Sequence, residues 1–167
     1  MGPYVTLLVL ALVAILQSTM TPHVRLLGVS PNLVLLYTVS SVLSQGLEEG
    51  IFVALVGGLM LDALSGAPFG VATVALVVVT LVAALGEINV FRAAKFLPYA
   101  TITMTTFVYN VVVLFALQMT GHVVIWGASL WRVVLPAMLV NLLCMPMAYG
   151  LACWLRKRLG PRSVEWQ

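Results

Sequence analysis

Apolar residues run along this chain in six long stretches, and each is separated from the next by a short group of polar residues, prolines or glycines. Within a stretch the residues are apolar on every side, which is typical of a helix surrounded by lipid. A helix that crosses a membrane needs about 20 such residues. The pattern predicts transmembrane helices at residues 3–20, 31–46, 49–65, 68–86, 95–119 and 130–155.

The same pattern argues against two other architectures. Strands of a membrane barrel alternate apolar and polar residues over about ten positions, and no such alternation is seen here. A soluble domain contains roughly 25% charged residues, whereas this chain of 167 residues has 8% charged and 62% hydrophobic residues. We therefore predict an all-α polytopic membrane protein, with one domain over residues 1–167 that forms a six-transmembrane-helix bundle. No Lys or Arg precedes the first stretch, so we expect a retained helix rather than a signal peptide.

Lys and Arg residues predict the orientation, because they concentrate in cytoplasmic segments. With both termini in the cytoplasm, the outside segments hold only Arg25 and Arg132. The cytoplasmic segments then hold Arg92, Lys95, Arg156, Lys157, Arg158 and Arg162. The net charge of +3 comes mainly from the last four of these, and we interpret them as the flank of a membrane helix rather than a nucleic-acid site.

Asp62 is the only ionisable residue well inside a predicted span, where an unpaired charge is costly. It belongs to a stripe of small residues at four-residue spacing, which allows another helix to approach closely. The stripe consists of Gly50, Ala54, Gly58, Asp62 and Gly66, and Gly70 continues the spacing after a turn at Pro68. No second ionisable residue lies at similar depth, so we favour a hydrogen-bonded residue that holds helix ends together. A proton or ion relay is the alternative.

Other polar residues inside the spans are interpreted as contacts between helices. Gln17 lies at a depth comparable with Asp62, and we expect a hydrogen bond between them. Asn141 lies in the sixth span between two prolines that can kink it. The fifth span is the most polar, with Thr101, Thr103, Thr105, Thr106 and Asn110.

Chemistry that would indicate an enzyme or a metal site is not found in the sequence. Cys144 and Cys153 are nine residues apart on one predicted helix and therefore point to opposite faces. His23 and His122 fall in predicted external loops without a ligand partner at metal spacing. No nucleophile motif, phosphate-binding glycine loop or pair of carboxylates is present. We expect no catalysis, cofactor or metal.

The segment from Gly57 to Gly70 resembles the core motif of the MreD family of bacterial rod shape-determining proteins. That family typically shows G-L/F-x-x-D followed by glycines, and the matching residues here are Gly58, Leu59, Asp62, Gly66 and Gly70. Gln17 and Pro31 also fit the family pattern. Asn32 follows Pro31 where the family often has Asp. Size and span number agree as well.

The resemblance implies a fold similar to the six-helix substrate-binding subunits of energy-coupling-factor transporters. It also implies a non-catalytic scaffold of the cell-elongation complex in the bacterial inner membrane, where peptidoglycan is synthesised. The direct partner would be MreC, a bitopic protein with a largely extracytoplasmic domain. Through MreC the chain would be linked to the RodA glycosyltransferase, its penicillin-binding transpeptidase and the MreB filament. Asp62, its small-residue stripe, Gln17 and Pro31 would then serve helix packing or partner binding.

Two other functions are compatible with the sequence. The same fold similarity would allow a substrate-binding subunit of a vitamin or small-molecule transporter. That function needs polar and aromatic groups that converge in the outer half of the membrane, such as Tyr109, Asn110, Trp126 and Trp131. A membrane enzyme acting on lipid-linked wall precursors is a weaker third hypothesis, because it would need an acidic metal motif.

Overall fold

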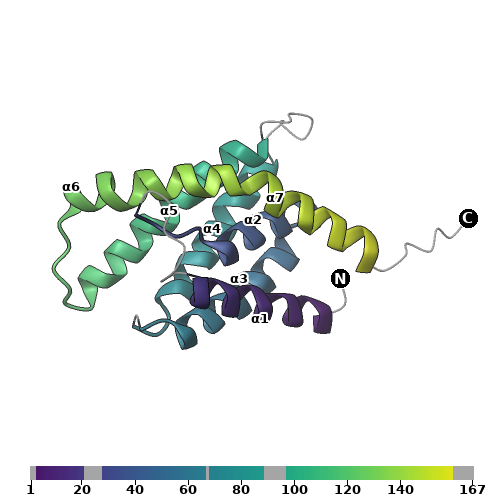
Figure 1. Ribbon diagram of the computed structural model, residues 1–167, viewed down its shortest axis with the longest axis horizontal. Coiled ribbons are helices and arrows are strands. Elements are labelled where there is room, and N and C mark those ends of the chain that lie inside the picture. The colour runs from purple at the N-terminus through teal and green to yellow at the C-terminus, as the bar shows by residue number, and fades with distance from the viewer. Residues whose placement is uncertain (1–2, 21–27, 67, 89–96, 160–167) are drawn as a thin grey trace, which may run out of the picture.

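The structure is a computed structural model that describes residues 3–20, 28–66, 68–88 and 97–159. The prediction of an all-helical protein is confirmed (Figure 1). Five helices come first: α1 (Pro3–Met20), α2 (Leu33–Gln45), α3 (Leu47–Leu64), α4 (Val71–Ile88) and α5 (Leu97–Met119). A final continuous helix consists of α6 (Trp126–Ser129), the π-helical turn η1 (Leu130–Val134) and α7 (Leu135–Leu159).

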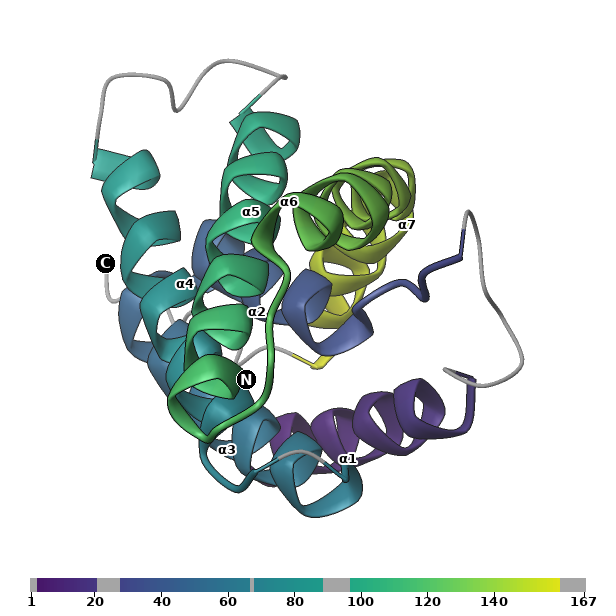
Figure 2. The same cartoon turned by 90° about the vertical axis from the view of Figure 1, so that its left-hand side faces the viewer.

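Helix α2 lies at the centre of the bundle, and α1, α3, α4, α5 and α7 pack around it (Figure 2). Its residues 34–42 are all buried, so this part of the helix has no exposed side. The polar residues within it are the small hydroxyl side chains of Thr38, Ser40 and Ser41 together with Tyr37. Side chains that are apolar or carry only a hydroxyl group can be buried on every side of a central helix, and residues 34–42 of α2 include no charged residue.

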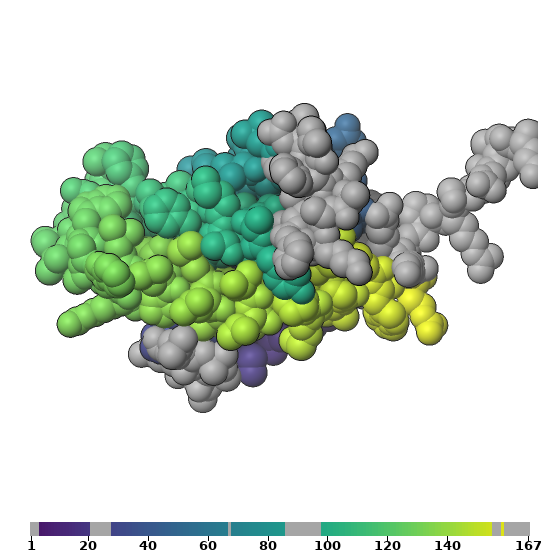
Figure 3. Space-filling model, turned by 90° about the horizontal axis from the view of Figure 1, so that it is seen from above, coloured from purple at the N-terminus to yellow at the C-terminus, as the bar shows by residue number. Residues whose placement is uncertain are grey.

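The surrounding helices present large apolar side chains to the outside. Leu8 on α1 is 62% exposed and Leu143 on α7 is 76% exposed, and similar residues follow along both helices. Figure 3 shows α7 running along the length of the face in view, beside α5. Outward-facing leucines on this scale suit contact with lipid rather than with water.

Not all of the helices have the length expected of a membrane span. By length and composition, Pro98–Met119 and Trp126–Trp154 could cross a membrane. The apolar helices Tyr4–Met20, Leu33–Gln45 and Val71–Leu85 are shorter. Six membrane crossings therefore stay a prediction.

Helix boundaries follow the predicted spans to within a few residues, with two informative differences. Helix α2 begins at Leu33 rather than at Pro31, because Asn32 caps it and the preceding residues are not helical. The last helix begins at Trp126 rather than at residue 130 and contains the π-helical turn. That turn ends two residues before Pro136, which has no amide hydrogen to give to a regular helix.

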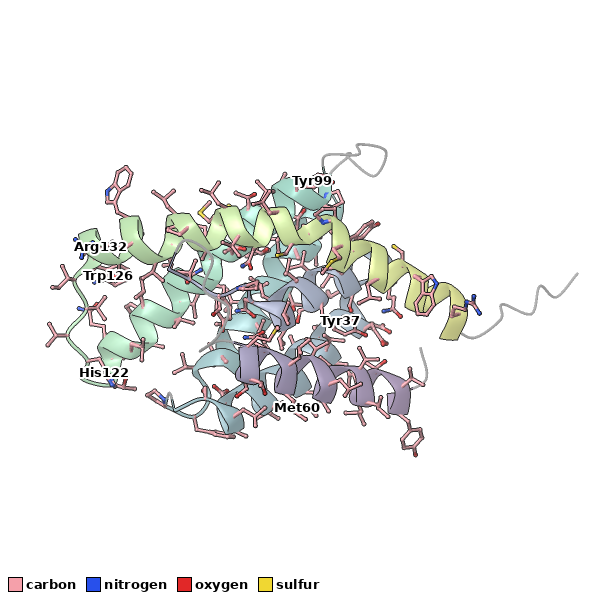
Figure 4. All side chains as sticks on the ribbon, in the orientation of Figure 1. Tyr37, Met60, Tyr99, His122, Trp126 and Arg132 are labelled. Atoms are coloured by element: carbon pink, nitrogen blue, oxygen red, sulfur yellow. The ribbon has the colours of Figure 1, made fainter. Side chains whose placement is uncertain are left out.

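Helix α1 begins at the same end of the molecule at which α7 ends (Figure 1). The turn between α5 and α6 lies at the opposite end, where Figure 4 places His122, Trp126 and Arg132. At the end of α7 the Arg158 guanidinium lies over the Trp154 ring, 5.7 Å from its centroid. Several residues used to predict the orientation or the loops lie outside the described residues, namely His23, Arg25, Arg92, Lys95 and Arg162.

Candidate functional site

Asp62 near the end of α3 caps the beginning of α4. Its Oδ1 atom accepts a hydrogen bond from the Ala72 amide at 2.9 Å, and its Oδ2 atom accepts one from the Thr73 amide at 3.1 Å. The Thr73 hydroxyl donates a third hydrogen bond to Oδ2 at 2.6 Å. The first amides of a helix have no partner within it, and an Asp, Asn, Ser or Thr side chain usually accepts from them. Gly70, immediately before α4, has no side chain, so the preceding helix supplies the cap.

The geometry favours the structural role of Asp62 over a relay. The side chain is only 3% exposed, and both of its oxygens accept hydrogen bonds from residues of α4. The positive end of the α4 dipole adds a favourable interaction with a negative charge at this position. Asp62 thus joins the end of α3 to the start of α4.

The small-residue stripe lies against neighbouring helices of the same chain. A Cβ atom on Gly58 would collide with the backbone of Thr73 on α4. A Cβ atom on Gly50 would collide with a Val42 methyl group on α2 and lie 3.2 Å from the Thr80 methyl group on α4. Ala54, between the two glycines, is fully buried.

The glycines that follow Asp62 do not belong to this packed face. Gly66 is exposed, and a Cβ atom there would meet nothing within 4 Å. Gly70 also faces open space, but its φ of +98° is a backbone conformation that favours glycine. Gly70 therefore serves the turn into α4, and the packed part of the stripe ends at Asp62.

Gln17 and Asn32 cap α2 in the same way that Asp62 caps α4. The Gln17 Oε1 atom accepts from the Val34 amide at 2.9 Å, and the Asn32 Oδ1 atom accepts from the Leu35 amide at 3.0 Å. Pro31 precedes this cap in the non-helical segment. The expected hydrogen bond between Gln17 and Asp62 is wrong, because the two side chains cap two different helices.

A further polar contact connects the start of α2 with α5 and α7. The Asn141 Oδ1 atom accepts from the Asn32 amide at 3.0 Å, and its Nδ2 atom donates to the Thr106 hydroxyl at 3.2 Å. Asn110 donates to the Thr106 carbonyl at 2.8 Å. The sequence analysis identified these residues as polar positions in apolar stretches, but it did not predict which of them contact one another. A carboxamide in the middle of an apolar stretch was the feature that indicated such a contact.

At the other end of the bundle, a hydrogen bond connects α1 with α3. The Thr6 hydroxyl, which is fully buried, donates to Glu49 Oε1 at 3.0 Å. Glu49 lies in the first turn of α3, where a negative charge is favoured.

The four residues considered for a transported ligand do not converge. Tyr109 and Asn110 line a pocket, whereas Trp126 donates to Gln118 Oε1 at 2.9 Å on the exposed end of the molecule and Trp131 is 75% exposed. Among the described residues, no group of three His, Cys, Asp or Glu side chains could hold a metal ion. Transport therefore gains no support from the geometry.

Comparison with known proteins gives one match. The family described as rod shape-determining protein MreD matches residues 1–152, which is nearly the whole chain. Neither the curated proteins nor the solved structures give a match, so the similarity to energy-coupling-factor transporter subunits stays a prediction. The matched segment contains the Asp62 cap, the α3 stripe and the caps of α2. The chain belongs to the MreD family, and it is a membrane protein with a role in determining rod shape.

Proposed function

We propose that this protein is a non-catalytic scaffold of the cell-elongation complex and that it binds MreC directly. The observation that carries the proposal is the family match over residues 1–152. RodA, the penicillin-binding transpeptidase and MreB would belong to the same complex through MreC.

The internal use of the polar side chains supports a scaffold. Asp62, Gln17 and Asn32 cap helices, and Asn141 connects α7 to the start of α2. These contacts fix the helices relative to one another. A partner helix in lipid is held mainly by close packing and a few polar contacts, so it needs a surface of constant shape.

The small-residue stripe of α3 does not supply that surface, because α2 and α4 of the same chain cover it. The outward-facing apolar sides of α1 and α7 are the larger candidates. They carry exposed residues along their length, including Leu8 and Leu12 on α1 and Leu139 and Leu143 on α7. Binding of a single membrane-spanning helix of MreC to one of these sides would leave the helix caps undisturbed.

The proposal includes six crossings of the inner membrane with both termini in the cytoplasm. The excess of Lys and Arg in the predicted cytoplasmic segments supports this orientation. The position of the start of α1 and the end of α7 at one end of the molecule agrees with an even number of crossings (Figure 1). The turn between α5 and α6 would then face the extracytoplasmic domain of MreC.

Co-expression with tagged MreC tests the direct contact. After solubilisation in a mild detergent, we expect the chain to co-purify with MreC and to remain bound through size-exclusion chromatography. An unrelated tagged bitopic protein, expressed at the same level, is the control. Failure to recover a complex from membranes that contain both proteins would count decisively against the scaffold.

A photo-crosslinking scan then identifies the contact face. A photoreactive residue is placed at Leu8 or Leu12 on α1 and at Leu139 or Leu143 on α7, with Val39 in the buried centre of α2 as the matched control. We expect crosslinks to MreC from one of the two helices and none from Val39. Crosslinks from neither helix, in a complex that does co-purify, would refute the assignment of the face without refuting the partner.

A further inference from the structure

The backbone immediately before α2 is not helical. Non-helical backbone inside a bilayer is costly, because its amide and carbonyl groups have no partners in lipid. Helix α2 has 13 residues, which correspond to about 20 Å at 1.5 Å per residue. The hydrocarbon core of a bilayer is about 30 Å thick. The described residues Gly28–Asn32 before α2 are not helical. With α2 as one of the six crossings proposed above, these residues lead part of the way into the membrane. Non-helical backbone at such depth is tolerated where it is buried in protein or lines a water-filled cavity.

A cavity of about 380 Å³ lies at this point, between the entry segment, α5 and the last helix. Its apolar lining comes from Val133 on η1 and Ala137 on α7, together with Val29. Its polar lining comes from Ser30, Asn32, Tyr109, Asn110 and Asn141. Among the described residues that line it, none is ionisable at neutral pH, and three are carboxamides.

Only part of the hydrogen-bonding capacity of these carboxamides is used by the fold. Asn110 donates from Nδ2 to the carbonyl of Thr106 on its own helix, which leaves its Oδ1 atom as an acceptor. Asn141 uses Oδ1 and one of its two N–H groups. The cavity therefore offers both acceptors and donors, without a charge.

We propose that this cavity binds an uncharged, hydroxyl-rich group such as a glycosyl or polyol moiety. A hydroxyl group both donates and accepts, so it matches a wall of carboxamides. An anionic or cationic group would find no opposite charge among the described residues that line the cavity, and an unpaired charge removed from water is costly. The volume lies at the lower end of the range of about 300–1,000 Å³ for ligand pockets, which suits a headgroup of the size of one sugar ring.

The same chemistry is presented by the headgroup of a membrane lipid and by a free sugar. Val133 at the edge of the cavity is 41% exposed and apolar, so it can contact the hydrocarbon part of a lipid. The measurement must therefore compare the two sources. It does not depend on which protein partner the chain binds.

The test is a binding titration by native mass spectrometry on the full chain, purified in an amine-oxide detergent that has no sugar headgroup. The probes are monoglucosyl diacylglycerol, diacylglycerol without a sugar, and free glucose. We expect the glucosyl lipid to bind at least about tenfold more tightly than diacylglycerol, which corresponds to one or two hydrogen bonds. Equal affinity for free glucose would support the cavity and assign a soluble ligand. Equal binding of the two lipids without binding of glucose would overturn the proposal.

A pair of variants on α5 ties the binding to the cavity. Asn110→Leu removes a lining carboxamide, and we expect about tenfold weaker binding of the glucosyl lipid. Thr103→Val is the matched control, because Thr103 also donates to a carbonyl of its own helix, that of Tyr99 at 2.8 Å, but does not line the cavity. Should Asn110→Leu fail to fold, Ala137→Leu fills the cavity from α7. Unchanged binding in a folded variant of either kind would overturn the proposal.

Discussion

Replacement of Asp62 tests whether its main role is to cap α4. Asp62→Ala removes the acceptor of three hydrogen bonds, two from backbone amides and one from the Thr73 hydroxyl. The amides of Ala72 and Thr73 are in the first turn of α4 and have no carbonyl of their own helix to bond to. Asp62 is the acceptor that the structure places at both amides.

The magnitude follows from the number of bonds that each substitution removes. At about 1 kcal/mol for each hydrogen bond, Asp62→Ala should lower the free energy of unfolding by about 3 kcal/mol. In Asp62→Asn the carboxamide oxygen still accepts from one amide, and its Nδ2 atom can donate to the Thr73 hydroxyl. One amide then faces an N–H group and loses its partner. With the weaker interaction with the helix dipole, the expected loss is about 1–2 kcal/mol.

The assay is equilibrium unfolding of the purified protein in mixed micelles, with an anionic denaturing detergent as the titrant and tryptophan fluorescence as the signal. Glu48→Gln is the control, because Glu48 is an exposed acid at the opposite end of α3. We expect the order wild type, Asp62→Asn, Asp62→Ala in decreasing stability, with Glu48→Gln close to wild type.

Two results would refute the reasoning. Asp62→Ala within about 0.5 kcal/mol of wild type would show that the carboxylate does not hold α4, since surface substitutions without a structural role fall in that range. Asp62→Asn with wild-type stability but no cell-shape function would point instead to a role for the charge itself.

Two further predictions use the same unfolding assay. Gly58→Ala should lower stability by about 1–2 kcal/mol, because the added Cβ collides with the Thr73 backbone while helix propensity improves by only about 1 kcal/mol, whereas Gly66→Ala should not lower it. Equal stability of these two variants would contradict the close approach of α3 and α4. Asn141→Leu should cost about 2 kcal/mol, because it leaves the Asn32 amide without its acceptor, and an unchanged free energy of unfolding would show that water replaces Asn141 there.

The positions of the helices could be predicted because a helix in lipid is defined by an uninterrupted apolar run. The run from residue 3 to residue 20 coincides with α1, and the other runs agree with the helices to within a few residues. The close packing of the α3 stripe could also be anticipated, since four-residue spacing places small residues on one face. Four-residue spacing does not show where the packed face of α3 ends. Gly66 continues the spacing but does not belong to that face.

The partner of Gln17 was mistaken because depth was estimated as if every span crossed the whole membrane. On that assumption the second span begins at Pro31 near the membrane surface, and Gln17 meets the end of the third span. Since α2 is short and begins at Leu33, its first amides lie deep enough to reach Gln17. The length of α2 therefore decides that the Gln17 carboxamide meets the Val34 amide. A short apolar run does not define the length of a helix sharply.

Helix beginnings explain the positions of three polar side chains beside or within the apolar runs, namely Gln17, Asn32 and Asp62. A helix that starts inside a bilayer has up to four amides without a partner, and lipid offers none. Gln17 and Asn32 accept from the first amides of α2, and Asp62 accepts from those of α4. Two of these three side chains come from a different helix, so each cap also fixes the position of one helix against another. In a sequence of this kind an isolated polar residue within an apolar run should first be tested as a cap for the next helix. Such a residue becomes a candidate for ligand binding only when it has donors or acceptors that the fold does not use, as Asn110 has in the cavity.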